Sequence, residues 1–206
     1  MIDFYTWSTP NGHKVAIMLE ETGLDYTLRP VNLGQGEQKQ PAFLAVNPNG
    51  KIPAIVDHDG PGGQELTIFE SGAVLLYLAE KSGQFLATDP TTRWHTVSWL
   101  MFQMGGLGPM LGQTGYFLHR APEPVPAAVE RFVDEAERLL EVVDSRLKEA
   151  EYLAGDYSIA DMASYPWLRN HGRFGIDVGD YPNLARWLDT IAARPAVQRG
   201  LTMLDD

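Results

Sequence analysis

The fold is decided by residues 52–69, IPAIVDHDGPGGQELTIF, which hold two short β-rich runs on either side of a turn. The runs are residues 52–57 and 66–69, and the first is entered through Pro53. The HDGPGG segment between them has the composition of a reverse turn. We therefore expect the two runs to pair as an antiparallel hairpin.

Strand-like and helix-like patterns alternate on both sides of this hairpin. Residues 2–5 form a short β-rich run, and residues 8–10, Ser-Thr-Pro, have the pattern of a helix start, a hydroxyl cap followed by proline. Residues 26–31 predict a second strand, and residues 71–81 predict an apolar helix capped by Ser71. The order β-α-β followed by β-β-α indicates one small mixed sheet with helices packed on it.

The patterns become entirely helical in the second part of the chain. Residues 93–118 and 124–149 have helical periodicity. Residues 105–113, GGLGPMLGQ, lack the Lys-Ser/Thr ending of a phosphate loop and do not follow a strand, so we interpret them as a helix kink. Ser158 and Asp161 have the spacing of a capping box, which favours a structural role for Asp161 over that of a catalytic base.

These patterns predict an α+β domain followed by an all-α domain. The expected boundaries are residues 1–84 for the first domain, 85–92 for a linker and 93–206 for the helical domain.

Composition excludes several classes of function. The formal net charge of −11 disfavours binding to nucleic acid and to anionic membranes, and no apolar stretch is long enough to cross a bilayer. The five histidines show no metal-ligand spacing, so no metal is expected. With no signal-peptide pattern at the start, we expect a soluble cytoplasmic protein. The chain has no cysteine, so any thiol chemistry requires a bound thiol.

The start of the first helix is a candidate anion site. Helix N-termini carry N–H groups without helical acceptors and a partial positive charge, which stabilise an anion such as a thiolate. Thr9 and Asn11 can add hydrogen-bond donors there without adding charge. The alternative is that Thr9 is only a helix cap and Asn11 only a surface residue.

Two further segments are candidates for peptide recognition. If the bond before Pro53 is cis, the backbone of Ile52 can pair with an extended peptide; the alternative is an ordinary trans proline at a strand start. Glu70 and Ser71 at a helix start can hold the ammonium and carboxylate of an α-amino acid, or Ser71 can be a plain cap.

Three cations are candidates for a second carboxylate of the ligand: Arg131, Lys51 and Lys14. Arg131 lies on an otherwise acidic predicted helix, where the alternative is an ordinary surface ion pair with Asp134 or Glu135.

Taken together, these motifs resemble the cytosolic glutathione transferases over the whole chain. The resemblance is carried by STPNGHKV (8–15), NPNGKIPAI (47–55), FESGA (69–73) and YSIAD (157–161). TPNGHK and GGLGPMLGQ resemble more narrowly the bacterial Nu class, which is related to the fungal nitrogen-regulatory prion protein.

The resemblance implies a thioredoxin-like N-terminal domain, an all-helical C-terminal domain and a homodimer. It also implies glutathione as co-substrate, with sulfur contacts from the catalytic residues Thr9 and Asn11. The glutathione-binding residues implied by it are Asn11, Gln38, Lys51, Ile52, cis-Pro53, Glu70, Ser71 and, from the partner subunit, Arg131.

The activity implied by the resemblance is that of a glutathione S-transferase that holds glutathione as a thiolate. Since the chain has no cysteine, it forms no mixed disulfide of its own. The expected reaction is glutathione-dependent reduction of disulfides, and of organic peroxides, with weak conjugating activity. Its partners are glutathione or glutathione disulfide and a small electrophile or disulfide. The alternative is a non-catalytic glutathione-binding or regulatory module of the same fold.

Overall fold

The computed structural model describes residues 1–204 and divides into two compact units. The first comprises Met1–Leu86 together with the segment that begins at Arg194, and the second comprises Ala87–Ala193.

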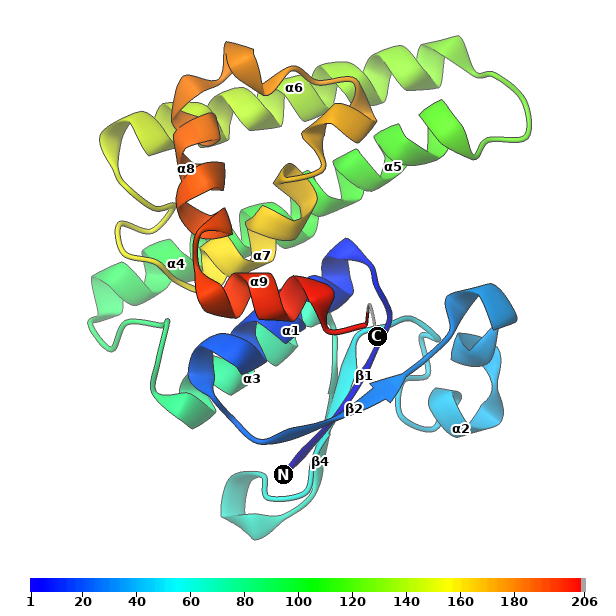
Figure 1. Ribbon diagram of the computed structural model, residues 1–206, viewed down its shortest axis with the longest axis vertical. Helices are drawn as coiled ribbons and strands as arrows, with labels where there is room; N and C mark the ends of the chain where they lie inside the picture. Colours follow the sequence, from blue (N-terminus) through cyan, green and yellow to red (C-terminus); the bar gives the residue numbers. More distant parts are fainter. Residues whose placement is uncertain (205–206) are drawn as a thin grey trace. The chain divides into compact units, whose positions relative to one another are not determined.

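A four-stranded mixed sheet organises the first unit (Figure 1). Its strands are β1 (Ile2–Thr6), β2 (Tyr26–Pro30), β3 (Ala54–Asp57) and β4 (Leu66–Phe69), in the order β2-β1-β3-β4. β1 pairs in parallel with β2 and antiparallel with β3, and β3 pairs antiparallel with β4. The predicted hairpin is confirmed.

Helices α1 (Pro10–Thr22) and α3 (Ser71–Ser82) pack on each other in this unit. A short helix, α2 (Pro41–Leu44), and the 3₁₀ turns η1 (Leu33–Gln35), η2 (Glu37–Lys39) and η3 (Pro61–Gly63) lie in the connections. Phe43 of α2 packs on Val31, Ala54 and Tyr5. Because Tyr5 and Ala54 are paired across β1 and β3, they lie on the same face of the sheet, which α2 covers.

The third strand begins later than predicted. Residues 52–57 were expected to form it, but β3 starts at Ala54, opposite Tyr5. Pro53 has no N–H to donate to a ladder, which keeps it and Ile52 outside the paired strand.

The second unit is helical, and residues 87–193 contain no strand beyond two isolated bridges. Its helices are α4 (Pro90–Phe102), α5 (Gly108–His119), α6 (Pro126–Glu149), α7 (Ile159–Leu168) and α8 (Pro182–Ala192), with 3₁₀ turns η5 (His171–Phe174) and η6 (Val178–Asp180). α5 and α6 run side by side, as Figure 1 shows in green, and α8 packs on α6.

The start of α4 lies inside the stretch predicted as a linker, residues 85–92. The side chain of Asp89 accepts a hydrogen bond from the Thr92 N–H at 2.8 Å, and Pro90 is the first helical residue. An acidic cap followed by proline is a helix-start signal, and the prediction did not use it.

The glycine-rich segment interrupts a long helix, as expected for a kink. Residues Gln103–Leu107, named η4, form a π-helical turn between α4 and α5. A π turn inserts a residue into the helix ladder and changes which side chains face the neighbouring helices. A Cβ atom at Gly112 of α5 would lie 3.4 Å from the Trp167 ring, and one at Gly115 would lie 3.2 Å from the Phe174 ring, so the two glycines make room for these rings.

Asp161 has the structural role that the sequence favoured. Its carboxylate is fully buried and accepts hydrogen bonds from the Leu153 N–H, the Trp187 indole N–H, and the N–H and hydroxyl of Ser158, at 2.9–3.1 Å. Burial raises the pKa of Asp161 to about 6, although these four donors favour its charged form. The capping box at the start of α7 is confirmed.

The last helix, α9 (Pro195–Thr202), groups with the first unit although the sequence placed it in the helical domain, residues 93–206. It packs on α1, where Arg194 pairs with Glu21 at 2.6 Å and Arg199 pairs with Glu20 at 2.6 Å. Gly200 lies directly against the backbone of Ile17, where a Cβ atom would be 2.8 Å from the Ile17 nitrogen. Local sequence does not reveal this contact because it joins segments about 180 residues apart.

We predict that Gly200→Ala lowers the free energy of unfolding by roughly 1–3 kcal/mol, since the added methyl group must push α9 away from α1. Urea unfolding measures the change. Gly172→Ala is the matched control, because a Cβ there meets no atom within 4 Å. Equal stability of the two variants would contradict the tight contact between α9 and α1.

Candidate functional site

The start of α1 is held closely against the end of β1. Thr9 is the N-cap, and its hydroxyl oxygen accepts a hydrogen bond from the Gly12 N–H at 3.2 Å. A side chain at Gly12 would collide with the Trp7 carbonyl oxygen and the Thr6 hydroxyl. Glycine at this position therefore lets the first turn of α1 sit directly on the strand end.

The cap bond leaves Thr9 able to donate. A hydroxyl has one proton and two lone pairs, so an oxygen that accepts from Gly12 still has its proton for another acceptor. Asn11 follows in the first turn of α1 and is half-buried like Thr9. The interpretation of Thr9 as a cap is confirmed, and it is compatible with a contact to a bound anion.

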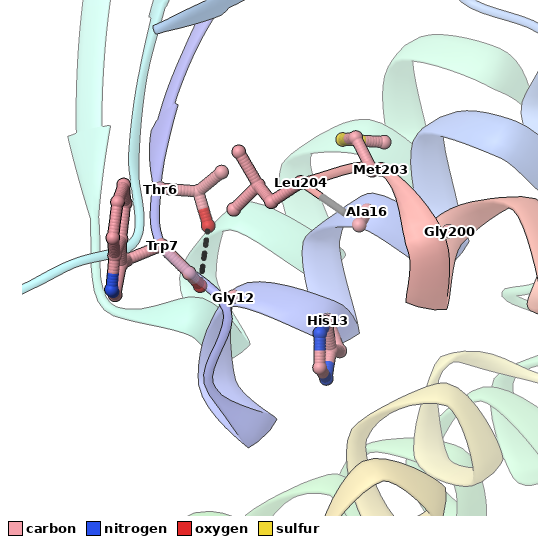
Figure 2. A pocket seen from close by; sticks show the side chains of 8 residues that line it. All are labelled: Thr6, Trp7, Gly12, His13, Ala16, Gly200, Met203 and Leu204. Carbon is pink, nitrogen blue, oxygen red and sulfur yellow. Dashed lines mark hydrogen bonds between the residues drawn. The ribbon is translucent and has the colours of Figure 1, made fainter. Parts of the chain in front are cut away.

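Behind this helix start lies a small cavity of about 10 Å³, shown in Figure 2. That volume is about the space of one water molecule, so the cavity is too small for a tripeptide. Met203 and Leu204 of the C-terminal segment border it next to α1 (Figure 2). The lining residues are Thr6, Trp7, Gly12, His13, Ala16, Gly200, Met203 and Leu204.

The loop before β3 is fixed by a buried asparagine that the sequence analysis did not single out. Asn47, 2% exposed, donates from Nδ2 to the Lys51 carbonyl oxygen at 2.6 Å and accepts from the Asn49 N–H at 3.0 Å. Both bonds lie within five residues, so the NPNGK pattern is itself a signal for this turn. The turn presents Ile52 beyond the end of the β3 ladder.

The Ile52–Pro53 peptide bond is cis, as the family resemblance implied. Ile52 is half-buried and Pro53 is buried, whereas the Lys51 side chain is exposed.

Gln38 lies on η2 and carries a buried acceptor. Within the described residues, its Oε1 atom is inaccessible to solvent and has no hydrogen-bond partner. A buried polar atom without a partner costs free energy, and an amide group of a ligand can satisfy it. This is a physical reason to place a ligand next to Gln38.

Glu70 and Ser71 form a strained helix start. Glu70 precedes α3 with φ +70°, an unfavourable backbone conformation for a residue other than glycine, and makes no side-chain cap bond. Its carboxylate is exposed, whereas Ser71 is buried as the first residue of α3. The expectation that Ser71 caps this helix is therefore wrong, because Glu70 occupies the cap position. No side-chain cap covers the α3 N-terminus, which suits it to hold a carboxylate.

The Lys14 side chain is buried next to the N-terminus of α3. It is 2% exposed, and its Nζ atom is 3.3 Å from the Ser71 Oγ atom. Burial lowers the pKa of Lys14 from 10.5 to about 7, and the charge of Glu70 acts in the opposite direction. Of the two candidate cations in the first unit, Lys14 is therefore buried beside Ser71, whereas Lys51 is exposed.

The structure places the sequence-predicted residues in two units. Thr9, Asn11, Gln38, Lys51, Ile52, Pro53, Glu70 and Ser71 belong to the first unit. Arg131 is exposed on α6 in the second unit, in a shallow surface depression with Glu130, Asp134, Glu135 and Arg138.

Two kinds of functional feature are absent from residues 1–204. No group of three His, Asp or Glu side chains there could hold a metal ion. None of the helices described is both long and apolar enough to pass through a bilayer.

Comparisons with known proteins identify the family of this fold. The glutathione S-transferase N-terminal domain family matches residues 9–81, and the glutathione S-transferase C-terminal domain family matches residues 107–195. The disulfide-bond oxidoreductase YfcG of Escherichia coli is 50% identical over 98% of this chain and 94% of its own length. The chain belongs to the glutathione S-transferase family, and the predicted family and fold class, a thioredoxin-like domain followed by an all-helical domain, are confirmed.

Two solved structures are similar over nearly the whole chain. A glutathione transferase family member from Pseudomonas fluorescens, with two glutathione bound, has a TM-score of 0.93 and 48% identity, covering 97% of this chain and 92% of that one. A glutathione transferase from Pseudomonas putida, with one glutathione disulfide bound per subunit, has a TM-score of 0.94 and 47% identity, covering 98% and 91%.

We predict that Glu70→Gly is more stable than Glu70→Ala and that both variants bind glutathione more weakly than the wild type. Glycine adopts φ +70° without strain, so the free energy of unfolding of Glu70→Gly should exceed that of Glu70→Ala by about 1 kcal/mol. Both variants lose the carboxylate and should lose a similar amount of glutathione affinity. Urea unfolding and calorimetric titration with glutathione measure the two effects. Equal stability of the two variants would mean that residue 70 is not strained.

Proposed function

We propose that the chain is a glutathione-dependent disulfide-bond oxidoreductase that holds glutathione as a thiolate at the start of α1. The similarity to YfcG supports the reaction, and the glutathione and glutathione disulfide bound to the two Pseudomonas proteins support the ligand. The observation that carries the proposal is the α1 start, which offers the uncharged donors of Thr9 and Asn11 in a chain without cysteine.

In this proposal Thr9 and Asn11 are the catalytic residues. The Thr9 hydroxyl proton and the Asn11 amide group donate to the glutathione sulfur, and the positive end of the α1 dipole adds to their effect. Donors to the charged form favour it, so the pKa of the bound thiol falls below its free value of about 8.5.

The other binding residues hold the rest of the tripeptide. Ile52 pairs by backbone with the cysteinyl unit, and Pro53 sets the direction of that backbone. Gln38 and Lys51 line the tripeptide, with the buried Gln38 Oε1 atom as an acceptor for one of its N–H groups. Glu70 holds the γ-glutamyl ammonium, and Ser71 with the α3 N-terminus holds its carboxylate.

The proposed assembly is a homodimer. Arg131, which is exposed on α6, reaches the glutathione carboxylate from the partner subunit. This gives a positive group to a site whose protein carries a net charge of −11.

The reaction is thiol–disulfide exchange in two steps. The bound glutathione thiolate attacks one sulfur of a disulfide R–S–S–R′, forming the mixed disulfide between glutathione and R–S and releasing R′–S⁻. A second glutathione thiolate attacks the glutathione sulfur of that mixed disulfide and releases R–S⁻, and both released thiolates take up protons. Two glutathiones are oxidised to one glutathione disulfide, and one disulfide is reduced to two thiols. The same thiolate can reduce organic peroxides and conjugate electrophiles slowly.

The experiment that tests this function is reduction of hydroxyethyl disulfide by glutathione, coupled to glutathione reductase. We expect a rate that is proportional to the protein concentration and well above the uncatalysed exchange. A protein that is retained on glutathione resin and gives only the background rate would be a binding module and not an enzyme.

We predict that Asn11→Ala reduces kcat for hydroxyethyl disulfide by about 10-fold or more and changes the Kd for glutathione by less than about 3-fold. The asymmetry follows because Asn11 contacts only the sulfur, so its loss lowers the thiolate fraction of bound glutathione while the contacts to the rest of the tripeptide remain. Glu70→Gln is the matched control, since it should weaken glutathione binding more than it lowers kcat. Equal losses of rate and affinity in Asn11→Ala would assign Asn11 to binding alone.

A further inference from the structure

Two lysines of the first unit differ from its other cations in having no partner. Among residues 1–86 and 194–204, the Lys and Arg side chains that contact another side chain are Lys14, Arg29, Lys81, Arg194 and Arg199. The side chains of Lys39 and Lys51 are exposed and make no ion pair or hydrogen bond within those residues. In a protein with a net charge of −11, two such cations are available to the anionic group of a ligand.

The Lys39 ammonium group lies on the turn that leads to Lys51. A Cβ atom at Gly50, where φ is +62°, would be 3.1 Å from the Lys39 Nζ atom. The Lys39 side chain therefore lies over the turn and does not extend away from it. Its nearest acidic neighbour in the sequence, Glu37, is engaged elsewhere, because the Glu37 carboxylate accepts a hydrogen bond from the Asn32 N–H at 2.6 Å.

A second feature of η2 points to a ligand at the same place. Gln38 precedes Lys39 in η2, and its buried Oε1 atom has no hydrogen-bond partner within the described residues. The Gln38 carbonyl oxygen also lies at Gly50, 3.1 Å from the position of a Cβ atom there. A ligand N–H group that satisfies the buried oxygen therefore brings the ligand next to the turn on which Lys39 lies.

The register of the sheet determines which end of glutathione comes to this turn. Ala54 at the start of β3 pairs with Phe69 at the end of β4, so the start of α3 lies beside the start of β3. With the γ-glutamyl group at the start of α3 and the cysteinyl unit on Ile52, the glycyl residue lies on the other side of Ile52, toward Gly50. One extended residue spans about 3.5 Å, so the glycyl carboxylate reaches the turn that carries Lys39.

We propose that Lys39 is a binding residue that, together with Lys51, holds the glycyl carboxylate of glutathione. The inference rests on the proposed function, because it assumes that the tripeptide lies along Ile52 with its γ-glutamyl group at the start of α3. Lys39 is a residue that the sequence motifs did not nominate. Its role makes the site selective for thiols and disulfides that carry a negative charge at the glycyl end.

A general effect of net charge is the alternative explanation for any loss of binding, and the chain offers a matched control for it. Lys148 on α6 is exposed like Lys39, makes no ion pair or hydrogen bond among residues 1–204, and belongs to the second unit. Lys148→Met therefore changes the net charge by the same amount as Lys39→Met. Lys39→Arg is the conservative variant, since it keeps a cation at the same position.

The test is a calorimetric binding cycle with glutathione and its glycyl amide, γ-glutamylcysteinylglycinamide, which lacks only the charge of the glycyl carboxylate. We expect the wild type to bind glutathione about 10-fold more tightly than the amide, and Lys39→Met to reduce this preference to about 2-fold by weakening glutathione alone. Lys148→Met and Lys39→Arg should keep the preference within about 2-fold of the wild type. At saturating glutathione, kcat of Lys39→Met should stay within about 2-fold, since the sulfur contacts are unchanged.

The outcomes are separable. Equal weakening of both ligands by Lys39→Met, or a preference that stays at its wild-type value, would overturn the inference. The same loss of preference in Lys148→Met would also overturn it, because the effect would then be one of net charge. A wild-type protein that binds both ligands equally would overturn the inference and leave the proposed function intact, whereas a wild-type protein that binds neither ligand would overturn the proposed function.

Discussion

The position of α1 is the constraint on which the rest of the site depends. Its first turn sits directly on the end of β1 because Gly12 has no side chain, and Thr9 caps it. One turn further, Lys14 reaches from the same helix to Ser71 of α3. At its other end, ion pairs to Arg194 and Arg199 and the contact with Gly200 hold α1 to α9. One helix thus fixes the distance between the thiolate site and the carboxylate site of the proposed ligand.

The electrostatic design follows from two facts of composition, the net charge of −11 and the absence of cysteine. An acidic protein that uses a borrowed thiolate must supply positive potential locally. At the proposed sulfur position, the N-terminus of α1 and uncharged hydrogen-bond donors supply this potential. They stabilise an anion without a positively charged side chain beside it.

Much of the fold could be predicted because its signals are local. The hairpin, the cap at Thr9 and the capping box at Ser158 depend on residues within a few positions of one another. The features that could not be predicted depend on distant contacts: α9 groups with the first unit, where Gly200 lies against Ile17, and the buried Lys14 contacts Ser71 of α3. For the candidate site, the motifs only nominate residues, and the structure is needed to show that Ser71 is the first helical residue and not the cap.

The central claim is that the α1 start lowers the pKa of a bound thiol. Ultraviolet absorbance of the thiolate, recorded as glutathione on the protein is titrated with base, measures it most directly. The account predicts that bound glutathione ionises at a pH lower than free glutathione by about 1 or more. Ionisation at the same pH as in free solution would contradict it.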